Sequence, residues 1–134
     1  EAAAPRILTP HPGEAARLLE RTTSEVQRDR YSAAAALAEQ SGQVVILKGA
    51  RSIVAAGEAL RVCAEGTPAL GVAGTGDVLS GVVGALAMTL EPLDAAIAGA
   101  LLHALAGVEA SVGDRGLIAS EVADAVPVVL DYMS

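Results

Sequence analysis

The chain has 134 residues, of which 52% are hydrophobic and only 1% aromatic, so its core must be built from small aliphatic side chains. A net charge of −7 predicts a surface that repels nucleic acids and anionic membranes, and no cluster of Lys and Arg offsets it. Cys63 is the only cysteine, which excludes an internal disulfide and predicts a reducing, cytoplasmic setting with a small apolar thiol beside a strand.

The chain opens on a short strand and a rigid turn. Residues 6–9 predict the strand, and a leader rich in Glu and Ala precedes it. The turn is Pro10-His11-Pro12-Gly13-Glu14, in which Pro12 suits the first position of a helix that continues to about residue 19. Because prolines flank His11, its backbone is fixed, as suits a group that must be placed accurately.

A longer helix follows this turn. Ser24 and Gln27 have the spacing of a capping box, which predicts a helix from there to about Gln40, ended by Gly42. The Glu, Asp and Arg side chains of residues 14–30 are interpreted as the solvated surface of these first helices and are assigned no site.

Three strands come next. The apolar run in residues 43–48 predicts a strand buried on both faces. Residues 52–56 and 60–64 predict two further strands, joined in a hairpin at Gly57-Glu58. Residues 65–71 are expected to form a loop.

Two long apolar helices follow, at residues 74–90 and 92–112. The apolar run of residues 95–108 is shorter than the roughly 20 residues of a membrane span, and His103 interrupts it. We therefore predict a buried core helix in which His103 is a hydrogen-bonded core or interface histidine. No other His and no Cys pair completes a zinc site, so no metal ligands are assigned.

A turn at residues 114–116 leads to the last helix. Ser120 is expected to cap this helix, which runs to about Tyr132 and is kinked or broken at Pro127. The order of helices and strands predicts an α/β fold in which helices cover a sheet.

The motif Gly74-Thr75-Gly76-Asp77 stands where the first of the long helices begins. Glycine allows a tight turn, and the free amides and dipole at a helix start bind anions, most often phosphate. A carboxylate would repel phosphate, so Asp77 is better explained as a base that acts on a neighbouring hydroxyl. The alternative is an ordinary helix start in which Asp77 is only a cap.

A second candidate motif, Lys48-Gly49-Ala50-Arg51-Ser52, follows the buried strand. Ligands of α/β proteins bind at the carboxyl ends of strands, where a cation and glycine amides could reach a nucleotide. The alternative is that Lys48 is simply the first solvated residue after the strand.

These motifs together resemble one enzyme family. Thr9-Pro10-His11-Pro12-Gly13-Glu14, Leu47-Lys48-Gly49-Ala50, Gly74-Thr75-Gly76-Asp77 and Asp114-Arg115-Gly116-Leu117-Ile118-Ala119-Ser120 occur in the order found in the C-terminal half of the ADP/ATP-dependent NAD(P)H-hydrate dehydratases. This family belongs to the ribokinase-like superfamily. The resemblance implies that residues 1–134 are the C-terminal portion of a single three-layer α/β/α domain.

The resemblance also implies a reaction. An ADP-dependent (S)-NAD(P)H-hydrate dehydratase would use ADP or ATP with Mg²⁺ to return hydrated NADH or NADPH to NADH or NADPH. Asp77 would be the catalytic base and would bind the substrate together with His11. The nucleotide would be bound by Lys48, Gly49, Ala50, Arg51, Ser52, Gly74, Thr75 and Gly76.

The sequence also allows alternative interpretations. Thr67 stands where the family commonly has Asn, and the N-terminal half of the family's domain lies outside this sequence, so the 134 residues alone are expected to lack full activity. A small-molecule kinase of the same superfamily, acting on a vitamin precursor or a sugar, would need the same base and anion site. The third alternative is an inactive nucleotide-binding fragment.

The small residues between 78 and 107 favour packing against a second copy and hence a homo-oligomer.

Overall fold

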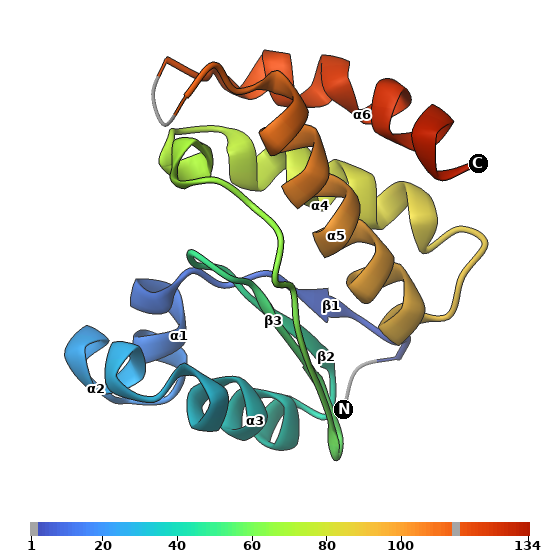
Figure 1. The fold of residues 1–134 in the computed structure, drawn as a ribbon. Helices are drawn as coiled ribbons and strands as arrows, with labels where there is room; N and C mark the ends of the chain where they lie inside the picture. Colours follow the sequence, from blue (N-terminus) through green and yellow to red (C-terminus); the bar gives the residue numbers. More distant parts are fainter. Residues whose placement is uncertain (1–2, 114–115) are drawn as a thin grey trace.

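The computed structural model describes residues 3–113 and 116–134, so residues 114 and 115 of the turn expected at 114–116 lie outside the described residues (Figure 1). The predicted alternation of helices and strands is confirmed. The elements in chain order are β1(Ile7–Leu8), α1(Pro12–Leu18), α2(Thr23–Arg28), α3(Arg30–Ser41), β2(Val44–Leu47), β3(Ile53–Ala56), β4(Ala59–Val62), the 3₁₀ helix η1(Pro68–Gly71), α4(Thr75–Leu86), α5(Pro92–Ala110) and α6(Ala119–Met133).

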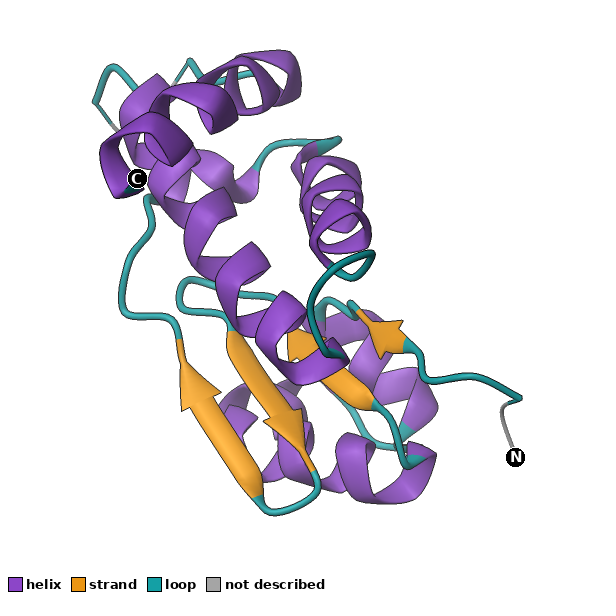
Figure 2. Cartoon of the chain, turned by 90° about the vertical axis from the view of Figure 1, so that its right-hand side faces the viewer, coloured by secondary structure: helices purple, strands orange, loops and turns teal. Residues whose placement is uncertain are grey.

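The strands form one sheet in the order β1-β2-β3-β4. β1 pairs parallel with β2, while β2–β3 and β3–β4 are antiparallel. Helices α1 to α3 cover one face of the sheet and α4 and α5 the other, which makes three layers (Figures 1 and 2). Helix α6 lies outside these layers, packed on α4 and α5.

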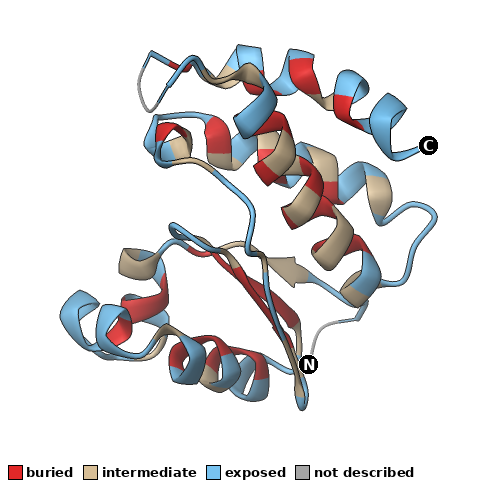
Figure 3. Cartoon of the chain, in the orientation of Figure 1, coloured by how far each residue is buried: buried red, intermediate tan, exposed pale blue. Residues whose placement is uncertain are grey.

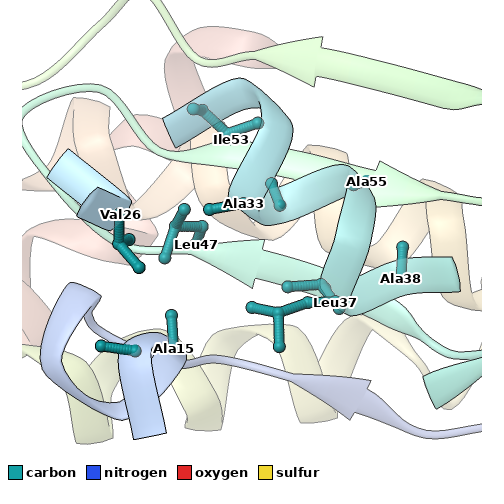
Figure 4. Close-up of a cluster of buried hydrophobic side chains, with 11 residues drawn as sticks. Ala15, Val26, Ala33, Leu37, Ala38, Leu47, Ile53 and Ala55 are labelled. Carbon is teal, nitrogen blue, oxygen red and sulfur yellow. The ribbon is translucent and has the colours of Figure 1, made fainter. Parts of the chain in front are cut away.

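The core follows from the two-residue period of strand β2, whose side chains are all buried. Val45 and Leu47 face the helices of the first layer, where Val26 and Leu37 also pack (Figure 4). Val44 and Ile46 face the opposite layer. A third apolar cluster joins α4, α5 and α6, so buried residues occur on both sides of the sheet and again beyond α5 (Figure 3).

The long helix predicted up to Gln40 is two helices. The capping box is formed by Thr22 and Glu25, not by Ser24 and Gln27. At Asp29 the backbone leaves the helical region (φ −146°, ψ 83°), and the Asp29 carboxylate accepts a hydrogen bond from the Ser32 amide. This second cap ends α2 and starts α3. Gly42, with φ 66°, ends α3 as predicted.

The ends of the last helices also differ from the sequence-based expectation. Helix α4 ends at Leu86, not near residue 90. Helix α6 begins at Ala119, so Ser120 lies inside it, and the Ile118 amide donates to Glu121 Oε2 at 2.9 Å. Pro127 lies inside α6, where it is exposed, and does not end the helix. Residues 68–71, expected to be loop, form η1.

Helix α5 begins at Pro92 as predicted and ends at Ala110, two residues before the predicted end. By length and composition alone its 19 residues could cross a membrane, with a mean hydropathy of 1.4 in the most apolar window. Helices buried in a protein core share these properties. Here α5 packs against β2, β3, α4 and α6, and we therefore describe it as the central helix of the fold.

The close approach of α4 and α5 depends on Gly99. A Cβ at this position would lie 2.5 Å from Val83 Cγ2 and 3.3 Å from Val83 Cα. We expect Gly99→Ala to lower the free energy of unfolding by about 1–2 kcal/mol, because the overpacking outweighs the gain in helix propensity. Urea denaturation measures this change.

Gly81→Ala is the matched control on α4, since Gly81 is exposed and has open space around its Cβ position. It should raise the free energy of unfolding by about 0.5–1 kcal/mol. If the Gly99 and Gly81 variants changed stability alike, tight packing at Gly99 would be refuted.

Candidate functional site

The first turn of α4 has a fixed shape. Gly74 precedes it in the left-handed region with φ 88°, which favours glycine. The buried Thr75 hydroxyl lies 2.8 Å from the Leu70 carbonyl and 3.0 Å from the Val72 carbonyl. The Asp77 amide donates to the Gly74 carbonyl at 3.1 Å, so the amides of Thr75 and Gly76 remain at the open end of the helix.

Lys48 lies directly against this turn. It follows β2, and its amide donates to the Pro10 carbonyl at 2.9 Å, which ties it to the segment after β1. A Cβ at Gly76 would come within 3.0 Å of Lys48 Nζ. The ammonium group therefore occupies the space that glycine leaves at the start of α4.

Two cavities meet at Lys48 and Gly76, which line both. The first, of about 600 Å³, lies between the β2–β3 connection, the 63–73 segment, α4 and α5. The second, of about 650 Å³, lies between the 7–10 segment, α1 and the first turns of α4. In Figure 1 the β2–β3 connection and the start of α4 lie at the same end of the molecule.

The structure divides the predicted site residues between these cavities. Gly49, Ala50, Ser52 and Thr75 line the first cavity. Gly74 and Asp77 line the second, where Glu14 and Ser80 also lie. The Asp77 side chain is exposed and therefore open to a ligand in that cavity. The residues at the helix start and the loop after β2 are thus brought together.

Arg51 is not brought together with them, because it is exposed and lines neither cavity. His11 lines the first cavity and not the one that Asp77 lines. The structure does not group these two residues with Asp77.

His11 also has a local structural role that the sequence analysis missed. Its Nδ1 accepts hydrogen bonds from the amides of Gly13 and Glu14 at 3.0 and 3.2 Å, and its own amide donates to Glu14 Oε2 at 2.9 Å. His11 is therefore the N-cap of α1 in a reciprocal capping box. The hydrogen bond from the His11 amide is the main reason that the pKa of Glu14 is lowered.

His103 is a site residue that sequence reasoning did not find. It is hydrogen-bonded, as expected of a core histidine, but its partner is the Thr75 carbonyl, 2.9 Å from Nε2, and its ring lines the first cavity. Burial lowers the pKa of His103, and the charge of Lys48 lowers it further, against the opposing effect of the Thr75 hydrogen bond. The apolar sequence around His103 does not indicate that its ring contacts Thr75, 28 positions earlier in the chain.

Two further observations concern reactive groups. Cys63, directly after β4, lines the first cavity, and burial raises the pKa of its thiol, which disfavours the nucleophilic thiolate. Among residues 3–113 and 116–134, no group of three or more His, Cys, Asp or Glu side chains is placed to hold a metal ion.

Comparisons with known proteins show which family and fold this chain is similar to. The sequence model of the NAD(P)H-hydrate dehydratase family matches residues 1–127. A bifunctional NAD(P)H-hydrate repair enzyme from Vibrio cholerae is 46% identical over 122 residues, which cover 89% of this chain and 25% of that relative.

Solved structures show the same fold. The ADP/ATP-dependent NAD(P)H-hydrate dehydratase from Bacillus subtilis, co-crystallised with ATP and Mg²⁺, superposes with a TM-score of 0.91 at 30% identity, over 100% of this chain and 50% of that one. A ribokinase-like superfamily protein from Enterococcus faecalis has a TM-score of 0.83 at 23% identity, over 100% and 47%, which shows the fold alone. The chain thus spans about a quarter of the repair enzyme and about half of each solved structure.

The half-buried position of His103 generates a prediction about pH. Because the pKa of His103 is lowered in the folded chain, the unfolded chain binds this proton first as the pH falls. Stability is therefore lost as the pH falls below about 6.5. In His103→Gln this loss of stability should disappear, while the side-chain amide of the glutamine still donates to the Thr75 carbonyl.

Urea denaturation of both proteins between about pH 7.5 and 5.5 measures the difference, in a range above the titration of ordinary carboxylates. A variant with the same pH dependence as the wild type would show that His103 titrates alike in the folded and unfolded chains.

Proposed function

This chain belongs to the NAD(P)H-hydrate dehydratase family, and from that premise we propose that it is the C-terminal part of an enzyme that dehydrates hydrated NADH or NADPH at the expense of ADP or ATP. In this proposal residues 1–134 form one portion of a single ribokinase-like domain. The match of the family model over residues 1–127 supports it. So does the likeness to the Bacillus subtilis enzyme.

The position of Lys48 is the observation that carries the proposal. The start of a helix is its positive end, and a cation placed there is repelled. Lys48 Nζ nevertheless lies against Gly76, in the first turn of α4. An anion held between the ammonium and the amides of Thr75 and Gly76 turns this repulsion into attraction on both sides. The phosphate chain of a nucleotide supplies such an anion.

The two cavities suggest how the reactants are divided. The nucleotide would occupy the first cavity, with its terminal phosphate at Lys48 and Gly76, the two residues that line both cavities. The hydrated nicotinamide would occupy the second, where Asp77 lies. Phosphoryl transfer needs the attacking oxygen and the leaving oxygen on opposite sides of phosphorus, as this division provides.

The chemistry follows from the substrate. Asp77 would take the proton from the C6 hydroxyl while that oxygen attacks the terminal phosphorus and the bond to the rest of the nucleotide breaks. Phosphate then leaves C6 with the bonding electrons, pushed by the lone pair of the ring nitrogen. Loss of a proton from C5 restores NADH or NADPH. The amides of Thr75 and Gly76 and the Lys48 ammonium would stabilise the charge that develops on the transferred group.

The residues present also fit a magnesium ion that enters with the nucleotide. Mg²⁺ keeps several waters and is held by phosphate oxygens with one or two carboxylates, rather than by a cage of protein ligands. Glu14 and Asp77 in the second cavity and Glu65 in the first could supply those carboxylates. When bound, the ion would neutralise charge on the phosphates.

We propose a cytoplasmic enzyme, in keeping with its unpaired Cys63. We also propose a homo-oligomer. Gly99 packs against Val83 within the chain, so the second copy would contact other small residues, such as the exposed Gly84 and Ala85 of α4.

Removal of the proposed base tests the catalytic step. In the complete enzyme, Asp77→Asn should lower turnover of hydrated NADH by about 10²–10⁴-fold, because the amide cannot accept the hydroxyl proton. ADP binding should persist. The recovery of NADH absorbance after ADP is added measures turnover.

Asp94→Asn is the matched control, because Asp94 is an exposed carboxylate in the first turn of α5 and lines neither cavity. Its turnover should equal that of the wild type. Near-normal turnover in Asp77→Asn would remove Asp77 from the mechanism.

Removal of the cation tests the phosphate site. Lys48→Ala should weaken ADP binding by about 10–100-fold, the value of one or two hydrogen bonds from a charged donor. Calorimetry measures the affinity, and Arg61→Ala, on the exposed strand β4, is the control for loss of a positive charge. Equal ADP affinity in Lys48→Ala and the wild type would contradict the proposed phosphate site.

A further inference from the structure

Arg30 reaches from the start of α3 to both ends of the loop after β2. One guanidinium nitrogen, Nη2, lies 3.3 Å from the carbonyl of Leu47 and 2.8 Å from the carbonyl of Arg51. The segment between these two carbonyls contains Lys48, Gly49 and Ala50, which line the first cavity. Arg30 was expected to belong to the solvated surface, but it is half-buried beneath this loop.

Gly49 packs directly on the Arg30 guanidinium. A Cβ at position 49 would overlap Arg30 Nη2 and Cζ, so a side chain and the guanidinium cannot occupy this space together. The absence of a side chain at position 49 is therefore explained by Arg30, since the φ of Gly49 is not in the left-handed region. The two residues form one contact.

The placement of Arg30 is costly. Its Nε is buried and has no hydrogen-bond partner among the described residues, which is energetically unfavourable. Within residues 3–113 and 116–134 no carboxylate forms an ion pair with it. Burial also lowers the pKa of the Arg30 guanidinium.

We propose that Arg30 is a positioning residue for the nucleotide: by tying the carbonyls of Leu47 and Arg51 together, it holds the loop so that Lys48 Nζ lies against Gly76. This inference rests on the proposed function. Lysine has a flexible four-carbon stem, so its ammonium is placed accurately only when its backbone is fixed. The Lys48 amide is fixed by the Pro10 carbonyl, and Arg30 fixes the remainder of the loop.

Arg30→Met in the complete protein tests this role, with Arg28→Met as matched control, since Arg28 is an exposed arginine at the end of α2. We expect Arg30→Met to weaken ADP binding and raise the nucleotide KM about tenfold, the value of one lost hydrogen bond from a charged donor. The KM for hydrated NADH should not change. Arg30→Lys should recover part of the affinity, because an ammonium can still reach one of the carbonyls.

Hydrogen exchange gives a readout that needs no nucleotide. In Arg30→Met the amides of residues 48–51 should exchange faster, while those of Val45 and Ile46 in β2 keep their wild-type rates. A purely structural role would instead accelerate exchange throughout β2 and α3 and leave the nucleotide KM unchanged.

Gly49→Ala perturbs the same contact from the loop side and covers the case in which Arg30→Met does not fold. It should reproduce the tenfold loss of ADP affinity, and the double variant should be no worse than the weaker-binding single variant. Wild-type ADP affinity in Arg30→Met or in Gly49→Ala, or fully additive losses, would overturn this inference alone. Failure of the wild-type protein to bind ADP would contradict the proposed function instead.

Discussion

The contact between Lys48 and the first turn of α4 is the interaction on which the rest of the site depends. It joins segments far apart in the sequence, and the Lys48 ammonium lies where a Cβ at position 76 would come within 3.0 Å of it. A lysine at the positive end of a helix raises the energy of the ligand-free protein. We propose that the same arrangement makes the free amides and the ammonium into one anion site, so that the unfavourable contact and the proposed anion binding have the same structural cause.

The aliphatic composition of the chain allows this contact to form. With so few aromatic side chains, helices approach closely at glycines: Gly99 meets Val83 of α4, and Gly107 meets Leu70 of η1. The Leu70 carbonyl in turn accepts a hydrogen bond from the Thr75 hydroxyl, and Nε2 of His103 on α5 is hydrogen-bonded to the Thr75 carbonyl. Helix α5 therefore contacts the start of α4 directly, through the polar His103–Thr75 contact, and indirectly, through the apolar Gly107–Leu70 contact.

Much of the fold could be predicted from local patterns, because those patterns report local physics. The four apolar residues of β2 predict a strand buried on both faces, and Gly42 predicts the end of α3; both are observed. The capping box was misplaced because Thr22 and Ser24 are both good caps, and the break at Asp29 depends on the contact with Ser32. The candidate residues at 48 and 74–77 could be proposed from the sequence, because glycine and charge at element ends are visible there. His103 and Arg30 were not, because their partners lie 17 to 28 residues away and nothing local encodes that distance.

Two glycines leave room for the cationic side chains of Lys48 and Arg30 at this site. Lys48 lies against Gly76, and Arg30 lies against Gly49, the residue that follows Lys48 in the same loop. Each glycine leaves space for a side chain from a distant element, and neither Gly49 nor Gly76 has a positive φ that would require glycine for backbone reasons. Glycine at positions 49 and 76 is therefore explained by the side chains that pack on these positions. The loop after β2 is held by Arg30 and in turn directs Lys48 to the helix start, so an arginine that lines neither cavity shapes the site through the backbone between them.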